Sequence, residues 1–290
     1  MPMRFLLHID FGSPARLKGR VKYFEYGGFE FKMIRNSAKW ANVLLTLVGP
    51  DDDVALQKAY AAGCEFLSAF CWQVGFPVAV SEGGGMTVPA NQTLRQARCR
   101  SFGFPLVVRE DRIDGFSISR LPLIETAEQR LGLTLYREAQ SSNKVWLSFL
   151  FYWQILEIGG RPSRQVVEEI ERAHPQLSLS RERQELSRHV GGSTDLRGNG
   201  LAQYFEEECR HAIAHIMRRP GRRTLAFDSL AENRRMAVSR DVIQGLAAHF
   251  IRDHLGLSKT VDLVRPVGGG FPRYVELRTA RRGSWVFVDR

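Results

Sequence analysis

The sequence predicts an α+β protein, because strand patterns and helix patterns occupy different parts of the chain. In the first 124 residues, short runs rich in aromatic and β-branched residues predict strands around one long helix. From Thr126 to about Gly256, apolar residues recur at helical spacing, with glycine and proline between the segments. Strand patterns then return. We therefore expect a mixed α/β domain over 1–124, a helical bundle over 125–257 and a short β-hairpin extension over 258–290.

The N-terminal part is expected to form a small sheet covered by a helix. RFLLHIDF and NVLLTLVGP predict single strands, and VKYFEYGGFEFKMI predicts a hairpin that turns at Gly27 and Gly28. The hairpin's aromatic residues could stack on nucleic-acid bases, but burial against a core is their commoner use. Three aspartates at 51–53 suit the start of a helix that continues to about Gly75.

The central part predicts a series of helices. The most apolar segment, VWLSFLFYWQILEI, is too short for a membrane span and contains Ser148, Gln154 and Glu157, so it predicts a buried core helix. The full set of expected helices covers about 126–141, 143–158, 162–173, 181–190, 200–218 and 232–255.

The net charge of the chain indicates which kind of partner it binds, and the absence of several motifs argues against several protein classes. The 290 residues carry a formal net charge of +10, which favours polyanionic partners such as RNA. The four cysteines form no C-x2-C pair, so neither a disulfide framework nor a zinc site is expected. The sequence contains no G-K-[ST] phosphate loop, G-x-S-x-G nucleophile or dinucleotide fingerprint. We expect a cytoplasmic protein without a cofactor, a bound metal or a membrane segment.

The segment CRHAIAHIMRRPGRR at 209–223 has the densest concentration of reactive side chains. On a helical wheel from Gln203 to Ile216, one arc is apolar and is expected to be buried. The opposite arc brings a carboxylate, a guanidinium and two imidazoles to spacings of three or four residues, within reach of one another. The buried arc comprises Phe205, Cys209, Ala212, Ile213 and Ile216, and the exposed arc comprises Glu207, Arg210, His211, Ala214 and His215.

Three interpretations of the exposed arc are open. It is a solvated helix face with an ion pair, which is the usual meaning of charge clusters on helices. Alternatively, Glu207, His211 and His215 are metal ligands, although Arg210 beside them would repel a cation. In the third interpretation the arc performs acid–base chemistry on RNA. An imidazole then moves the proton of a 2′-hydroxyl or of the leaving oxygen, while Arg210 stabilises the charged phosphate.

The hexapeptide RHAIAH resembles the R-x4-H signature of the HEPN superfamily. The segment LYREAQSSNKVWLSFLFYWQILEIGG is similar to the first helix pair of bacterial HEPN-like proteins, and FDSLAENRRMAVSRDVIQGLAAHFIRDHLGL to the helix that follows the motif. The resemblance covers about 120–256 and implies a helical bundle, often a homodimer. Active members are metal-independent ribonucleases, and others are inactive or only bind RNA. In this resemblance Arg210 and His215 form the reactive pair and His211 assists them. From its place on the same helix face, Glu207 is expected to support the site.

The chain also resembles MauJ-like proteins of methylamine utilisation, which place a variable N-terminal part before a helical region with an RHAIAH-like motif. Two functions are therefore expected. One is a metal-independent endoribonuclease that cleaves RNA through the 2′-hydroxyl, and the other is a non-catalytic RNA-binding or accessory protein of the MauJ-like kind. Four arginines beyond the helix either complement the helix dipole or contact RNA phosphates. They are Arg218, Arg219, Arg222 and Arg223.

Overall fold

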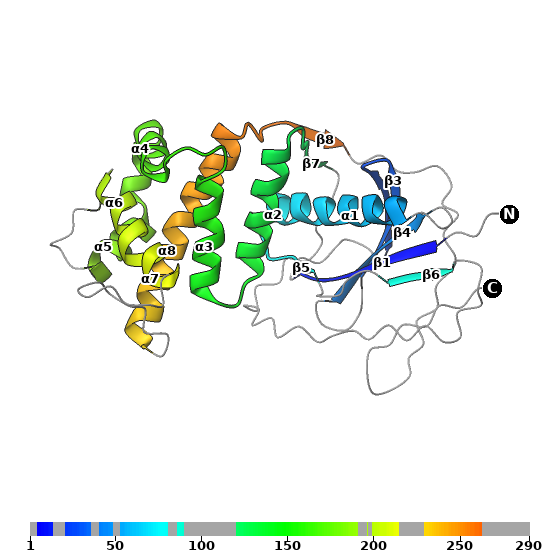
Figure 1. The fold of residues 1–290 in the computed structure, drawn as a ribbon, viewed down its shortest axis with the longest axis horizontal. Helices are drawn as coiled ribbons and strands as arrows, with labels where there is room; N and C mark the ends of the chain where they lie inside the picture. The colour runs from blue at the N-terminus through cyan, green and yellow to red at the C-terminus, as the bar shows by residue number, and fades with distance from the viewer. Residues whose placement is uncertain are drawn as a thin grey trace. The chain divides into compact units, whose positions relative to one another are not determined.

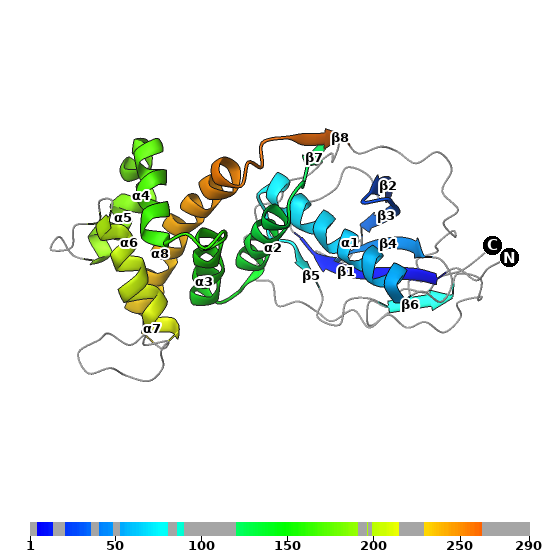
Figure 2. The same cartoon turned by 45° about the horizontal axis from the view of Figure 1, so that its top comes forward.

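The computed structural model describes residues 5–13, 21–35, 41–48, 53–80, 86–89, 120–190, 196, 199–214 and 229–262. Contacts between Cα atoms divide the chain into two compact units, Met1–Pro122 with Thr260–Arg290, and Leu123–Lys259. The described strands belong to the first unit and most described helices to the second (Figures 1 and 2). Helices and strands in separate regions are compatible with the predicted α+β class. The three-part domain division stays a prediction.

The first unit contains an antiparallel sheet with strand order β2-β3-β4-β1-β5, and β6 also pairs with β1. The two expected single strands are confirmed as β1 and β4, and the expected hairpin is confirmed as β2 and β3. The strand bounds are Phe5–Gly12 for β1, Val21–Tyr26 for β2, Phe29–Arg35 for β3, Ala41–Val48 for β4, Ala79–Val80 for β5 and Met86–Pro89 for β6.

Glycine is required at the turn of the β2–β3 hairpin. Gly27 and Gly28 have φ angles of 59° and 79°, which L-residues with a side chain rarely adopt. A Cβ atom at Gly27 would also lie 3.1 Å from the Cβ of Ala62 in the long helix of this unit. The double glycine therefore reverses the chain and permits the close approach of this helix.

That helix is α1 (Asp53–Val74), and it packs against β1, β2 and β4. Aromatic rings from the hairpin and the helix form the core, because Phe24 and Phe66 stack with ring centroids 4.3 Å apart. Phe31 and Phe70 extend the same stack, and all four side chains are buried. Core packing is thus confirmed for Phe24 and Phe31, which are not available for base stacking.

A second, two-stranded sheet pairs segments that are distant in the sequence. β7 (Arg120–Pro122) runs antiparallel to β8 (Thr260–Asp262), with Leu121 opposite Val261. The described part of the expected C-terminal extension therefore pairs with an earlier strand. Residues 263–290, where we expected the remainder of a hairpin, lie outside the described residues.

The second unit is helical, and the expected helices are found close to their predicted positions. Its hydrophobic centre is α3, which packs against α2 and α8 (Figure 1). The helix buries Phe149 and Trp153. No helix within the described ranges is long and apolar enough to cross a membrane. The α-helices are α2 (Ala127–Ser141), α3 (Val145–Leu156), α4 (Ser163–Ala173), α5 (Arg181–Val190), α6 (Asn199–Tyr204), α7 (His211–Ala214) and α8 (Leu230–His249).

Two of the expected regular helices contain π-helical turns, which is a correction to the sequence analysis. The helix expected at 200–218 widens into a π-helix at Phe205–Arg210, and the helix expected at 232–255 does so at Phe250–His254. We call these segments η2 and η3. A 3-10 turn, η1 (Pro175–Leu179), follows α4. A π turn closes i to i+5 hydrogen bonds, so its geometry departs from the 100° per residue on which the helical wheel was drawn.

Candidate functional site

The helix that carries RHAIAH is described as far as Ala214, as α6, η2 and α7 in succession. Its predicted buried arc is confirmed for Phe205, Cys209, Ala212 and Ile213. The backbone N–H of His211 donates to the carbonyl of Glu206, which is the i to i+5 bond of the π turn. Of the expected site residues, Glu207 and Arg210 therefore lie in a π turn, whereas His211 begins the α-helix α7.

Arg210 lies against a carboxylate at the end of α3. Its Nε atom is 3.6 Å from Oε1 of Glu157, and both side chains are 37% exposed. The indole N–H of Trp153 donates to the same carboxylate oxygen at 2.7 Å, which fixes the position of Glu157. Arg210 thus forms a partly exposed ion pair with Glu157. Trp153, a buried residue of the bundle core, holds the carboxylate of this pair in place.

Glu207 faces a different partner from the one that the wheel predicted. Its carboxylate lies 3.6 Å from Nη2 of Arg164 in α4, and it accepts a hydrogen bond from Gln203 at 3.3 Å. Arg164 also binds the neighbouring Glu206, with 2.9 Å between Nε and Oε2. The single cluster that we expected is therefore divided, because Glu207 faces α4 while Arg210 faces α3.

The remaining expected site residues are only partly placed. His211 follows Arg210 and is half-buried, and its side chain takes part in further interactions. His215, the second half of the R-x4-H motif, lies outside the described residues. The same is true of the expected RNA-contacting residues Arg218, Arg219, Arg222 and Arg223.

A buried polar network lies beneath the π turn and was missed by the sequence analysis. The guanidinium of Arg235 in α8 binds the carboxylate of Glu232 at 2.9 Å, the hydroxyl of Tyr204 at 2.6 Å and the carbonyl of Glu208 at 3.2 Å. Ser239 lies 3.2 Å from the same hydroxyl. Burial and these partners hold a charged group inside the unit, where an unpaired charge would be very unfavourable.

Burial also governs the acidity of the groups around Arg235. Cys209 is fully buried, and this burial raises the pKa of its thiol. The pKa of Tyr204 is likewise raised, mainly by burial, in spite of the nearby Arg235. A thiol with a raised pKa is a poor nucleophile, so Cys209, which lies on the expected buried arc, is a packing residue and not a reactive thiol.

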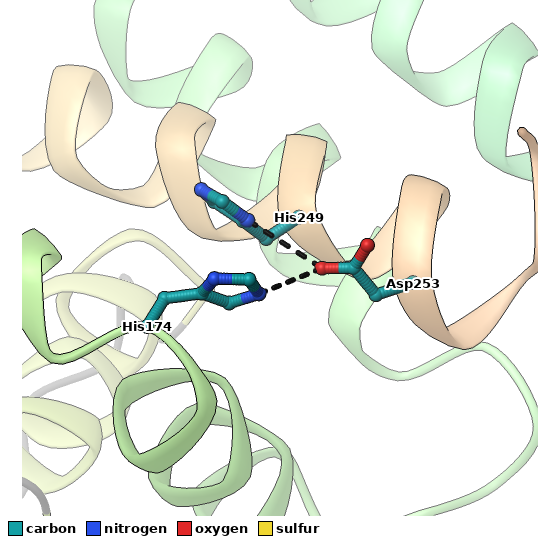
Figure 3. Close-up of side chains that lie close together, drawn as sticks. All are labelled: His174, His249 and Asp253. Carbon is teal, nitrogen blue, oxygen red and sulfur yellow. Dashed lines mark hydrogen bonds and ion pairs between the residues drawn. The ribbon is translucent and has the colours of Figure 1, made fainter.

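A second cluster of titratable groups joins α4 to the end of α8. His174 lies at the C-terminal cap of α4, and its Nε2 atom is 2.8 Å from Oδ2 of Asp253. Nδ1 of His249 is 3.5 Å from the same oxygen, and the two imidazole rings are 4.2 Å apart at their centroids. Figure 3 shows both contacts converging on one carboxylate oxygen.

The protonation of this cluster follows from burial and from its neighbours. Burial lowers the pKa of His249, and His174 and Arg252 act in the same direction against the effect of Asp253. Burial would raise the pKa of Asp253, but the contacts with the two histidines outweigh it and the pKa is lowered. The cluster therefore combines an ionised carboxylate with a histidine that favours its neutral form.

Only part of this cluster could be predicted from the sequence. His249 and Asp253 are four residues apart, so a helix brings them to one face. His174 lies 79 residues before Asp253, and only the packing of α4 against α8 brings it to them. Among the described residues, these three are the group whose ligand atoms are close enough to hold a metal ion, with every ligand atom within 4.8 Å of the others.

Comparison with known proteins gives one match. The model of a family described as methylamine utilization protein MauJ matches residues 133–252, from the middle of α2 into η3. No curated protein and no solved structure matches the chain. The helical unit is therefore similar to the MauJ family, and the MauJ-like resemblance seen in the sequence is supported over this range.

Proposed function

We propose that this chain is an accessory protein of methylamine utilisation and that it does not cleave RNA. The observation that carries the proposal is the match to the MauJ family, which extends over most of the helical unit and includes Arg210 and the buried network around Arg235. The description of that family names methylamine utilisation, and we propose the same process for this chain.

The surroundings of Arg210 support a role without RNA cleavage. Its guanidinium is already close to Glu157, and the acidic residues Glu206, Glu207 and Glu208 lie two to four residues before it in the chain. A phosphodiester at this position would have to displace the carboxylate of Glu157, because two negative charges that compete for one guanidinium repel each other. The described part of this face is therefore better suited to a protein or a cationic partner than to RNA.

A growth experiment tests the accessory role. We expect deletion of the gene in its host to slow growth on methylamine as nitrogen source and to leave growth on ammonium unchanged. Expression of the wild-type chain and of Arg210→Ala should both restore growth, because Arg210 has no catalytic role in this proposal. Equal growth of the deletion strain and its parent on methylamine would contradict the proposal.

The second candidate is a metal-independent endoribonuclease, as the HEPN resemblance implies. The observation that favours it is the position of Arg210 and His211, which adjoin and are both partly exposed, as a phosphate-binding and proton-transferring pair requires. In this candidate His215 is the general acid or base, and Arg210 stabilises the transition state. The helical unit would act as a cytoplasmic homodimer, with the four downstream arginines along the RNA.

An RNA assay separates the two candidates. The purified chain is incubated with mixed RNA in EDTA, and the accessory proposal expects no cleavage. Cleavage that leaves 2′,3′-cyclic phosphate ends, and that both Arg210→Ala and His215→Ala abolish, would instead establish the ribonuclease.

Binding of RNA is tested with a variant that removes the carboxylate beside Arg210. If Arg210 contacts phosphate, Glu157→Gln should strengthen RNA binding, because it removes a competing negative charge. The matched control is Glu182→Gln, which removes an exposed carboxylate on α5. An equal and small response of the two variants would support the accessory proposal.

A further inference from the structure

We propose that His174, His249 and Asp253 form a binding site for one divalent transition-metal ion, with two imidazoles and one carboxylate as ligands. The site goes beyond the accessory role proposed above and does not depend on Arg210. It lies within the helical unit and uses residues from α4, α8 and η3 (Figure 3).

The distances from the two ring nitrogens to the carboxylate oxygen are close to those around a single ion. Tetrahedral Zn²⁺ with bonds of about 2.0–2.1 Å requires neighbouring ligand atoms to be about 3.3 Å apart. Nδ1 of His249 and Oδ2 of Asp253 are already 3.5 Å apart. Nε2 of His174 is 2.8 Å from that oxygen, so this hydrogen bond would lengthen by about half an ångström as the metal replaces it.

The buried ring nitrogen of His249 is a second, independent observation. Within the described part of the chain, Nδ1 of His249 is buried and has no hydrogen-bond partner. Its contact with Asp253 at 3.5 Å is too long for a hydrogen bond. Buried polar atoms in native proteins are rarely left unsatisfied, and a bound metal ion would satisfy this nitrogen. Figure 3 shows this nitrogen on the side of the ring that faces Asp253.

The backbone at this position supports a functional site. Asp253 lies in the π-helical turn η3, which follows directly after His249. Such turns are rare and occur frequently at functional sites, where they redirect a side chain. His174 is fixed from the other side, because it ends α4 immediately before Pro175. Two rigid elements therefore present the ligands to each other.

The ligand types select the kind of metal. Imidazole nitrogens with one carboxylate suit Zn²⁺, Fe²⁺, Co²⁺ or Ni²⁺, whereas Ca²⁺ and Mg²⁺ prefer sites made of oxygen ligands. Three protein ligands also leave at least one coordination position for water or another molecule. Arg252, next to Asp253, opposes a cation, but its side chain is exposed and its charge is screened by solvent.

Metal titration of the untagged full-length chain tests the site. The protein is treated with EDTA, dialysed and titrated with Co²⁺, whose visible absorption reports the coordination geometry. We expect one Co²⁺ per chain, displaced by Zn²⁺, and a Zn²⁺-dependent rise in Tm. His174→Ala, His249→Ala and Asp253→Asn should each weaken binding at least about tenfold.

The matched control is His189→Ala, which removes an exposed histidine on α5 and should bind Co²⁺ as the wild type does. Circular dichroism in EDTA establishes that each variant is folded, and Asp253→Asn keeps the shape of the side chain. Failure of the wild type to bind one equivalent of Co²⁺ would overturn the proposal. So would folded ligand variants that bind as tightly as the control.

Discussion

At the scale of single residues, Arg235 is the side chain whose environment is most completely determined. Its side chain is only 4% exposed, and its guanidinium binds a carboxylate, a hydroxyl and a backbone carbonyl. Each of these partners would lose a hydrogen bond if the guanidinium were removed, and the carboxylate of Glu232 would remain buried without its counter-charge. The complete network therefore stabilises the contact of α8 with the π turn, whereas loss of one member would leave buried polar groups without partners and destabilise the contact.

We therefore expect Arg235→Ala to lower the free energy of unfolding by about 3–5 kcal/mol, the usual effect of breaking a buried ion pair. Arg234→Ala is the matched control, because Arg234 is the exposed neighbour and should change stability by less than about 0.5 kcal/mol. Urea unfolding followed by circular dichroism measures both. The double variant Glu232→Leu/Arg235→Met should recover part of the loss, since it leaves no buried charge. Equal stabilities for Arg234→Ala and Arg235→Ala would refute this account.

At the scale of the elements, the start of α2 is defined by a reciprocal cap. Thr126 accepts a hydrogen bond from the backbone of Gln129, and the Gln129 side chain accepts one from the backbone of Thr126. Gln129 also donates to the carbonyl of Leu255 at 2.8 Å, just beyond η3. One buried amide thus begins a helix and ties it to the far end of the last helix of the unit.

Gln129→Ala should consequently cost about 2 kcal/mol, of which about 1 comes from the cap and the rest from the unsatisfied carbonyl of Leu255. Thr126→Ala removes only the cap and should cost about 1 kcal/mol. Glu128→Ala, at an exposed position between them, serves as control. Denaturant titration of the three variants gives the ranking, and a loss for Gln129→Ala no greater than that for Thr126→Ala would contradict it.

Such local signals explain which elements the sequence could predict. The cap at Thr126, the glycine turn at Gly27 and the apolar spacing of α3 all act over a few residues, and the corresponding elements lie close to their expected positions. The π turns could not be predicted, because they depend on how η2 and η3 pack against other helices. For the same reason the wheel placed Glu207 beside Arg210, although the structure directs Glu207 to Arg164.

At the scale of the whole molecule, the two compact units have separate cores. One core is built from stacked phenylalanines between a sheet and α1, and the other from Phe149, Trp153 and their neighbours around α3. A chain with two cores need not unfold in a single two-state transition. A change in solution conditions that alters the stability of one core alone would therefore identify the part of the unfolding transition that belongs to that core.

Lys32 provides such a condition through pH. It lies on β3, is only 5% exposed and has its ammonium 5.3 Å from the centre of the Tyr23 ring. Burial lowers the pKa of Lys32 to about 8, from an ordinary value of 10.5. Below pH 8 the folded protein therefore holds a buried charge, which destabilises it relative to the unfolded chain. This destabilisation disappears as pH rises towards 10.5, because the unfolded chain then also loses the proton.

Lys32→Met should accordingly stabilise the sheet unit near pH 7, by up to about 3 kcal/mol, and by progressively less as the pH approaches 10. Lys58→Met, on the exposed side of α1, is the control and should have a small effect on stability. Urea unfolding of wild type and both variants at the two pH values measures the difference, so the titration of other groups cancels. If the increase in the free energy of unfolding caused by Lys32→Met were constant or rose with pH, the ammonium would be well accommodated in the folded sheet.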